Sequence, residues 1–167
     1  MFVPDEISGE PAPDHGPAED LDKVIRRLVD SQPYGVLCTQ GQGQPYGSLV
    51  AYAMTPELDA AVFATQKATR KYRLLSESAR VALVVDNRSA LPGRLMDVEA
   101  VTATGHAHEV PRGSEFDRWS RLLTDRHPYL NTFVYSESCG LFRIDIVRYL
   151  YVTRFQEVRQ WVPTRPG

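Results

Sequence analysis

Apolar positions recur with a helical period in three segments of the chain. In residues 20–32, apolar residues stand at i, i+3, i+4 and i+7, which is the spacing of one face of an amphipathic helix, and Asp20 is the candidate N-cap. Residues 114–126 have a similar apolar face, and Ser114 and Asp117 match the pattern of a capping box. The predicted helices cover residues 20–32, 68–78 and 114–126.

Six other segments have the composition and alternation of β-strands. Short turn sequences such as "QGQGQ" join several of them directly, which favours antiparallel pairing. Some segments are apolar on both faces, which fits a small closed barrel better than an open sheet. In the last segment, alternation places one apolar set on a single face: Phe142, Ile144, Ile146, Leu150 and Val152. The predicted strands cover residues 34–39, 45–54, 60–65, 80–86, 97–110 and 139–153.

Length and charge predict a single domain of residues 18–162 in the 167-residue chain. Residues 1–20 hold six acids, four prolines and neither Lys nor Arg, so we expect residues 1–17 to be a disordered acidic tail. Residues 163–167 are expected to form a short C-terminal tail. There is no apolar run of membrane-spanning length and no signal-peptide order, and two cysteines indicate a reduced, cytoplasmic protein without a membrane partner.

One stretch concentrates positive charge. In "VFATQKATRKYRLL", residues 62–75, four basic residues fall within seven positions and no acid stands among them. The stretch follows a strand and opens a helix, whose N-terminus offers free N–H groups and partial positive charge. Lys67, Arg70 and Lys71 are spaced to share one helix face, and either Thr65 or Thr69 could cap it.

These donors and cations together predict a phosphate site. The alternative is a solvated basic helix, because the stretch is neither a Walker loop nor a dinucleotide fingerprint. We do not expect nucleic-acid binding, because Tyr72, the aromatic residue beside the charge, is predicted to face the core.

The segment "FATQKATRKYRLL" resembles the part of pyridoxamine 5′-phosphate oxidase and its relatives that holds the phosphate of FMN. The resemblance continues through "GQPYGSLVAYAM", "SARVALVVDN" and "RHPYL", and through "VEAVTATGHAHEV", with its order of Thr102, Gly105 and Ala107. It covers roughly residues 20 to 160. It implies a mainly β fold, a six-stranded antiparallel split β-barrel with flanking helices, and a homodimer with FMN sites built by both chains at the interface.

The resemblance also implies which residues bind the cofactor. Arg70 and Lys71 match the phosphate-binding Arg-Lys pair, and Thr65 matches a Thr at the end of a strand. The second-strand positions are those whose backbone faces the flavin ring. The full set of implied cofactor-binding residues is Ser48, Leu49, Val50, Ala64, Thr65, Thr69, Arg70 and Lys71.

The departures from the oxidase are equally specific. An Arg of its second-strand motif is replaced around Ser48, and its C-terminal Arg-x-His signature is missing, so we do not expect oxidation of pyridoxamine phosphate. The resemblance implies instead a flavin-dependent oxidoreductase acting on an unidentified small molecule. The alternatives are a non-catalytic flavin carrier or electron-transfer module, a haem- or deazaflavin-binding relative, and a module without a cofactor.

Three further residues are left with open roles. His106 and His108 share one strand face, where they could line a pocket or bind metal; because there is no third ligand, a polar strand surface or a dimer contact is favoured over metal. No catalytic acid–base pair stands out, and Trp161 lies near the place where relatives set an aromatic residue against the cofactor.

Overall fold

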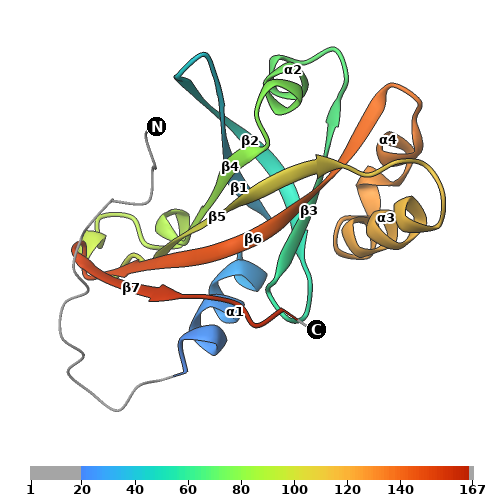
Figure 1. Ribbon diagram of the computed structural model, residues 1–167. Helices are drawn as coiled ribbons and strands as arrows, with labels where there is room; N and C mark the ends of the chain where they lie inside the picture. The colour runs from blue at the N-terminus through green and yellow to red at the C-terminus, as the bar shows by residue number, and fades with distance from the viewer. Residues whose placement is uncertain (1–19, 166–167) are drawn as a thin grey trace.

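The computed structural model describes residues 20–165 (Figure 1), so the expected acidic tail of residues 1–17 lies outside the described part. The described residues form seven strands interspersed with helices, and the first three strands follow one another directly. The elements are α1 (Leu21–Ser31), β1 (Tyr34–Gly41), β2 (Gln44–Met54), β3 (Ala60–Gln66), α2 (Arg70–Glu77), β4 (Arg80–Asp86), the short 3-10 helices η1 (Arg88–Ala90) and η2 (Leu95–Asp97), β5 (Ala100–Glu109), α3 (Ser114–Arg126), η3 (Pro128–Leu130), α4 (Asn131–Tyr135), β6 (Cys139–Thr153) and β7 (Glu157–Trp161).

The strands form a closed antiparallel barrel. They are hydrogen-bonded in the order β3-β2-β1-β4-β5-β6-β7, and β3 also pairs with β6, which closes six strands on themselves. β7 lies outside this closure, as an added strand along the end of β6. The predicted six-stranded antiparallel barrel is confirmed.

Two hydrophobic cores lie on the two sides of the barrel wall. The inner core is filled by the inward face of the strands and is closed at one end by α1, whose Val24, Ile25, Leu28 and Val29 are buried in it. The outer core lies where α3 packs across β3 and β6, and Trp119 and Leu123 are buried there (Figure 1). α2 covers the opposite end of the barrel from α1 (Figure 1), which leaves its first turn beside the strand ends.

The alternation predicted for residues 139–153 is right only for the first half of β6. Ile144 and Ile146 are buried as expected, but beyond Val147 the buried residues are Tyr149 and Tyr151, not Leu150 and Val152. The register explains the change: Thr104 pairs with Arg148 and Gly105 with Ile146, so Val147 is an extra residue. This β-bulge shifts the alternation of β6 by one position.

Helix ends differ from prediction in their caps. Asp20 stands at the N-cap of α1, but its carboxylate accepts from the Lys23 ammonium at 2.8 Å instead of from a backbone N–H. The expected capping box of Ser114 is wrong: Gly113 is the N-cap of α3, with φ of 136°, and no side chain caps the helix. Gly113 takes this place because its backbone conformation suits a residue without a Cβ.

The start of the fifth strand and the presence of a seventh also differ from prediction. The fifth strand begins at Ala100 instead of residue 97, since Leu95–Asp97 turn as a 3-10 helix. β7 was not predicted; it places Trp161 with its ring centroid 5.6 Å from that of Tyr149, against the inner core. Trp161 is therefore a packing residue of the barrel end.

Candidate functional site

The barrel wall opens on one side of β2. Residues 52–54 of β2 pair with 61–63 of β3, but among the described residues the earlier part of β2 has no strand partner on that side. Lys71 of α2 reaches across this gap, where its ammonium donates to the Leu49 carbonyl oxygen at 3.5 Å. The N–H and C=O groups of a strand residue point to the same side, so the Leu49 backbone faces the opening.

Thr69 organises the start of α2 beside this opening. It is the N-cap, and its hydroxyl accepts from the Tyr72 amide at 3.3 Å and donates to the Gln66 carbonyl at 2.8 Å. Because that bond uses its one proton, the Thr65 hydroxyl, 3.1 Å away, must be the donor between the two threonines. Thr65 and Thr69 therefore fix the end of β3 to the helix, and of the two alternatives Thr69 is the cap.

Two backbone donors remain free at this end of the helix. Within residues 20–165 the amides of Arg70 and Lys71 have no acceptor, as expected for the first turn of an α-helix. They add to the positive end of the helix dipole. The start of α2 thus offers two N–H groups that need an acceptor from outside the protein.

The two predicted phosphate-binding cations differ in their surroundings. The guanidinium of Arg70 is exposed and lies over the Tyr46 ring, 5.1 Å from its centroid. Lys71 is half-buried, and burial lowers the pKa of its ammonium from the usual 10.5. The expectation that Lys67 shares their helix face is wrong, because Lys67 precedes α2 and its amide donates to the Ser138 carbonyl.

Ser48 places a hydroxyl on the open stretch of β2. Its hydroxyl oxygen is buried and has no hydrogen-bond partner among the described residues. Buried hydroxyls are nearly always bonded, so an unpartnered one marks a place where a ligand atom or water is expected. Ser48 precedes Leu49 on the open stretch of β2.

The side chains of the other predicted cofactor-binding residues point away from the opening. The Leu49 side chain is 74% exposed on the outer face, Val50 is buried in the inner core, and half-buried Ala64 packs against the outer one. Only the backbones of Val50 and Ala64 can therefore face a ligand. Ser48, Leu49, Thr65, Thr69, Arg70 and Lys71 come together around the opening.

Of the two tyrosines of β2, Tyr46 and Tyr52, only Tyr52 is a core residue. Tyr52 is fully buried and donates to the Val29 and Gln32 carbonyls, and burial raises the pKa of its phenol to about 12. Tyr46 instead lies under Arg70. The Arg-Tyr pairing depends on α2 folding over β2, so no local sequence signal could have shown it.

The histidines lie away from the opening. His106 and His108 are exposed on the outer face of β5, where the His108 Nε2 atom is 3.7 Å from the Asp145 carboxylate. His127 is buried, and its Nε2 atom is 2.8 Å from the Tyr52 carbonyl oxygen. In residues 20–165, His, Cys, Asp and Glu side chains do not form any group of three that could hold a metal ion.

A split six-stranded barrel with a basic helix N-terminus beside an open strand edge defines the class of the split-barrel proteins. The sequence profile described as pyridoxamine 5′-phosphate oxidase matches residues 21–158. The chain belongs to this family. No curated protein sequence matches the chain.

Solved structures share the fold at low sequence identity. The haem-binding protein from Mycobacterium smegmatis is 19% identical with a TM-score of 0.76, over 89% of this chain and 60% of the other. An FAD-binding protein from Mesorhizobium loti is 17% identical with a TM-score of 0.63, over 77% and 91%. HutZ, the haem storage protein from Vibrio cholerae, is 16% identical with a TM-score of 0.62, over 86% and 94%.

The chain spans about 60% of the length of the M. smegmatis protein. In the described part, none of the helices has the length and apolar character needed to cross a membrane.

Proposed function

We propose that the protein binds FMN in the opening of the barrel and is a flavin-dependent oxidoreductase acting on a small molecule. One observation carries the proposal: the free amides of Arg70 and Lys71, with their two cations, converge beside the open edge of β2. A phosphate carries about two negative charges, which such a set matches. The unpartnered Ser48 hydroxyl fits a ligand that continues from the phosphate along β2.

The residues have distinct roles in this proposal. Arg70, Lys71 and their amides hold the phosphate, and Thr69 keeps the helix start in place through its bonds to Gln66 and Tyr72. The Leu49 backbone, once released by Lys71, offers a donor and an acceptor to the edge of the ring. The flavin would supply hydride or electron transfer, while the protein supplies its position. A site with a single phosphate position favours FMN over FAD.

We further propose that the protein is a homodimer with its cofactor sites at the interface. The resemblance to the oxidase family supports this. We also place the protein in the cytoplasm, because Cys38 and Cys139 are both free thiols. A monomeric mass by light scattering with flavin bound would contradict the dimer.

Haem is the second candidate ligand, because two of the structural neighbours are named for haem binding or storage. Haem iron needs an axial ligand, and the described histidines lie on the outer face of β5 or are buried against the Tyr52 carbonyl. This arrangement favours the flavin. The same phosphate site would serve a deazaflavin, and it would also serve a flavin carrier that has no catalytic activity.

The test is an absorbance spectrum of the purified full chain before and after FMN is added and unbound FMN is washed away. Retained flavin bands support the proposal, and oxidation of the reduced flavin that depends on an added acceptor distinguishes an enzyme from a carrier. A chain that retains no FMN but gives a Soret band with haem would contradict it.

A further inference from the structure

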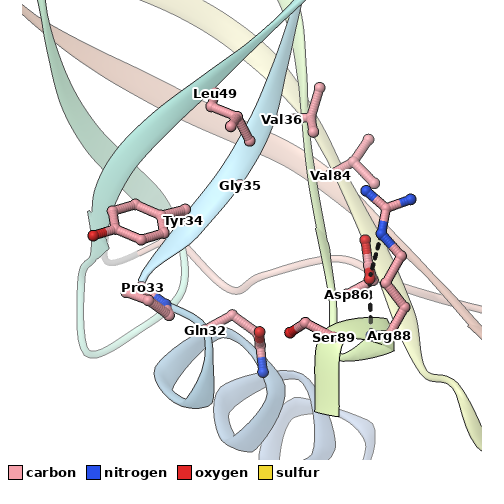
Figure 2. A pocket seen from close by; sticks show the side chains of 10 residues that line it. All are labelled: Gln32, Pro33, Tyr34, Gly35, Val36, Leu49, Val84, Asp86, Arg88 and Ser89. Atoms are coloured by element: carbon pink, nitrogen blue, oxygen red, sulfur yellow. Dashed lines mark hydrogen bonds and ion pairs between the residues drawn. The ribbon is translucent and has the colours of Figure 1, made fainter. Parts of the chain in front are cut away.

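A pocket of about 380 Å³ lies on the outer face of the barrel, beside the opening but distinct from it. Its floor comes from β2, β1 and β4, where the pairing sets Leu49 next to Val36 and Val36 next to Val84. Figure 2 shows these three side chains in a row across the strands. The floor is therefore an apolar strip one side chain wide and three strands long.

Polar groups stand at the two sides of this floor. Tyr34, at the start of β1, lies on one side, and Asp86 and Arg88, at the end of β4, lie on the other (Figure 2). The Tyr34 ring is 53% exposed and its hydroxyl accepts from Tyr129 at 3.3 Å. The pocket thus has an aromatic wall opposite a charged wall.

Asp86 pairs with the guanidinium of Arg88 on its Nε side. One oxygen of its carboxylate accepts from the Arg88 backbone amide at 2.9 Å and lies 3.3 Å from the Nε atom. The two terminal nitrogens of Arg88 have no acceptor among residues 20–165, and in Figure 2 they point away from Asp86 beside Val84. A guanidinium anchored through Nε presents its outer edge as a paired donor, the arrangement that binds a carboxylate.

We propose that this pocket binds an aromatic carboxylate, with its ring on the Val36, Leu49 and Val84 floor and its carboxylate on Arg88. The volume is at the small end of the range for ligand sites and admits one or two rings. Leu49 lines the floor with its side chain and the opening with its backbone. The bound molecule would therefore lie next to the flavin, and its assignment as the substrate rests on the proposed function.

The test is calorimetric titration of the FMN-free full chain with 2-naphthoate and with its neutral analogue, naphthalene-2-carboxamide. We expect 2-naphthoate to bind with a Kd below about 1 mM and Arg88→Met to weaken it at least about tenfold. The carboxamide should bind the two proteins within about twofold of each other, because it makes no charge-assisted pair. Arg94→Met is the matched control, since Arg94 is another exposed arginine paired to an acid, Asp97 at 2.9 Å, outside the pocket.

Three results would overturn the proposal: no binding of 2-naphthoate at about 1 mM, equal losses in the Arg88 and Arg94 variants, or an affinity that falls as protein concentration rises. The last would show that a second copy of the chain occupies the floor. These titrations contain no FMN, so a failure of FMN binding leaves them intact. With FMN bound, 2-naphthoate should shift the flavin bands of the wild type, and unshifted bands would overturn the assignment as substrate.

Discussion

The ammonium of Lys71 lies 3.5 Å from the carbonyl oxygen of Leu49, which joins the first turn of α2 to the open edge of β2. Without a ligand, this contact gives the half-buried charge one weak acceptor. A phosphate would replace it with a stronger one. Lys71 is therefore the residue whose surroundings should change most when the site fills.

Replacing both Arg70 and Lys71 with Ala should weaken FMN binding by about 100-fold or more. Each removes a charge-assisted hydrogen bond, worth roughly 1.5–3 kcal/mol, while the amides remain. Flavin fluorescence quenching during titration measures the affinity.

Arg73→Ala is the matched control for this double variant. Arg73 belongs to the same helix, is exposed and pairs only loosely with Glu77 at 3.9 Å. It should bind FMN as the wild type does. Equal weakening by the Arg73 variant would show that general positive charge, and not a defined site, attracts the cofactor.

FMN affinity should decline at alkaline pH earlier than an ordinary lysine would allow. Burial lowers the pKa of Lys71 below 10.5, so its ammonium is lost as pH rises through that lowered pKa, and phosphate binding restores the proton. The sign for stability is opposite: the unfolded chain holds this proton to higher pH, so the FMN-free fold gains stability across the same window. Titrations from neutral pH to about pH 10 measure the decline.

Lys71→Arg should remove that alkaline decline, because a guanidinium stays protonated throughout the range. Proton uptake on binding can be measured directly by calorimetry in buffers of different ionisation enthalpy. An unchanged alkaline decline in the Arg variant would assign the titration to another group.

Ser48→Ala should stabilise the FMN-free protein while weakening its hold on FMN. The buried Ser48 hydroxyl has no partner among the described residues, and such a group costs about 1–3 kcal/mol. We expect the free energy of unfolding to rise by about 1 kcal/mol and FMN affinity to fall roughly fivefold. Urea unfolding and FMN titration measure the two effects.

Ser120→Ala provides the control, since Ser120 in α3 is also buried with an unpartnered hydroxyl but lies in the outer core region. It should stabilise the fold similarly and leave FMN binding unchanged. If Ser48→Ala raised stability without any loss of affinity, the ligand would not reach Ser48.

The sequence could predict the barrel, and the grouping of the candidate phosphate-binding residues, because both follow from the local order of residues. Thr65, Thr69, Arg70 and Lys71 are neighbours in the chain, so their grouping was visible before folding. Tyr46 under Arg70 and the unpartnered Ser48 hydroxyl depend on how α2 lies over β2, which spacing does not show. The outer pocket is built from three separate segments and left no motif.

The bulge in β6 is the clearest case where alternation misled. A period of two predicts the outward and inward faces of a strand only while each residue has a partner. Val147 has none on β5, so Tyr149 and Tyr151 took the core positions predicted for Leu150 and Val152. On the neighbouring strand, Gly105 lies at the position of the bulge. The family resemblance included this glycine, but strand propensity gave no reason for it.

Gly105→Ala should therefore destabilise the barrel, by about 2–3 kcal/mol in urea unfolding. A Cβ at this position would lie 2.2 Å from the Asp145 carbonyl oxygen, a backbone atom that cannot rotate away. Gly47→Ala is the control on β2, because its Cβ would meet only Val36 at 3.4 Å, an ordinary contact. Gly47→Ala should change stability by less than about 0.5 kcal/mol. Equal stability of the two variants would contradict this close approach, because it would show that β6 can move away from Gly105 without cost.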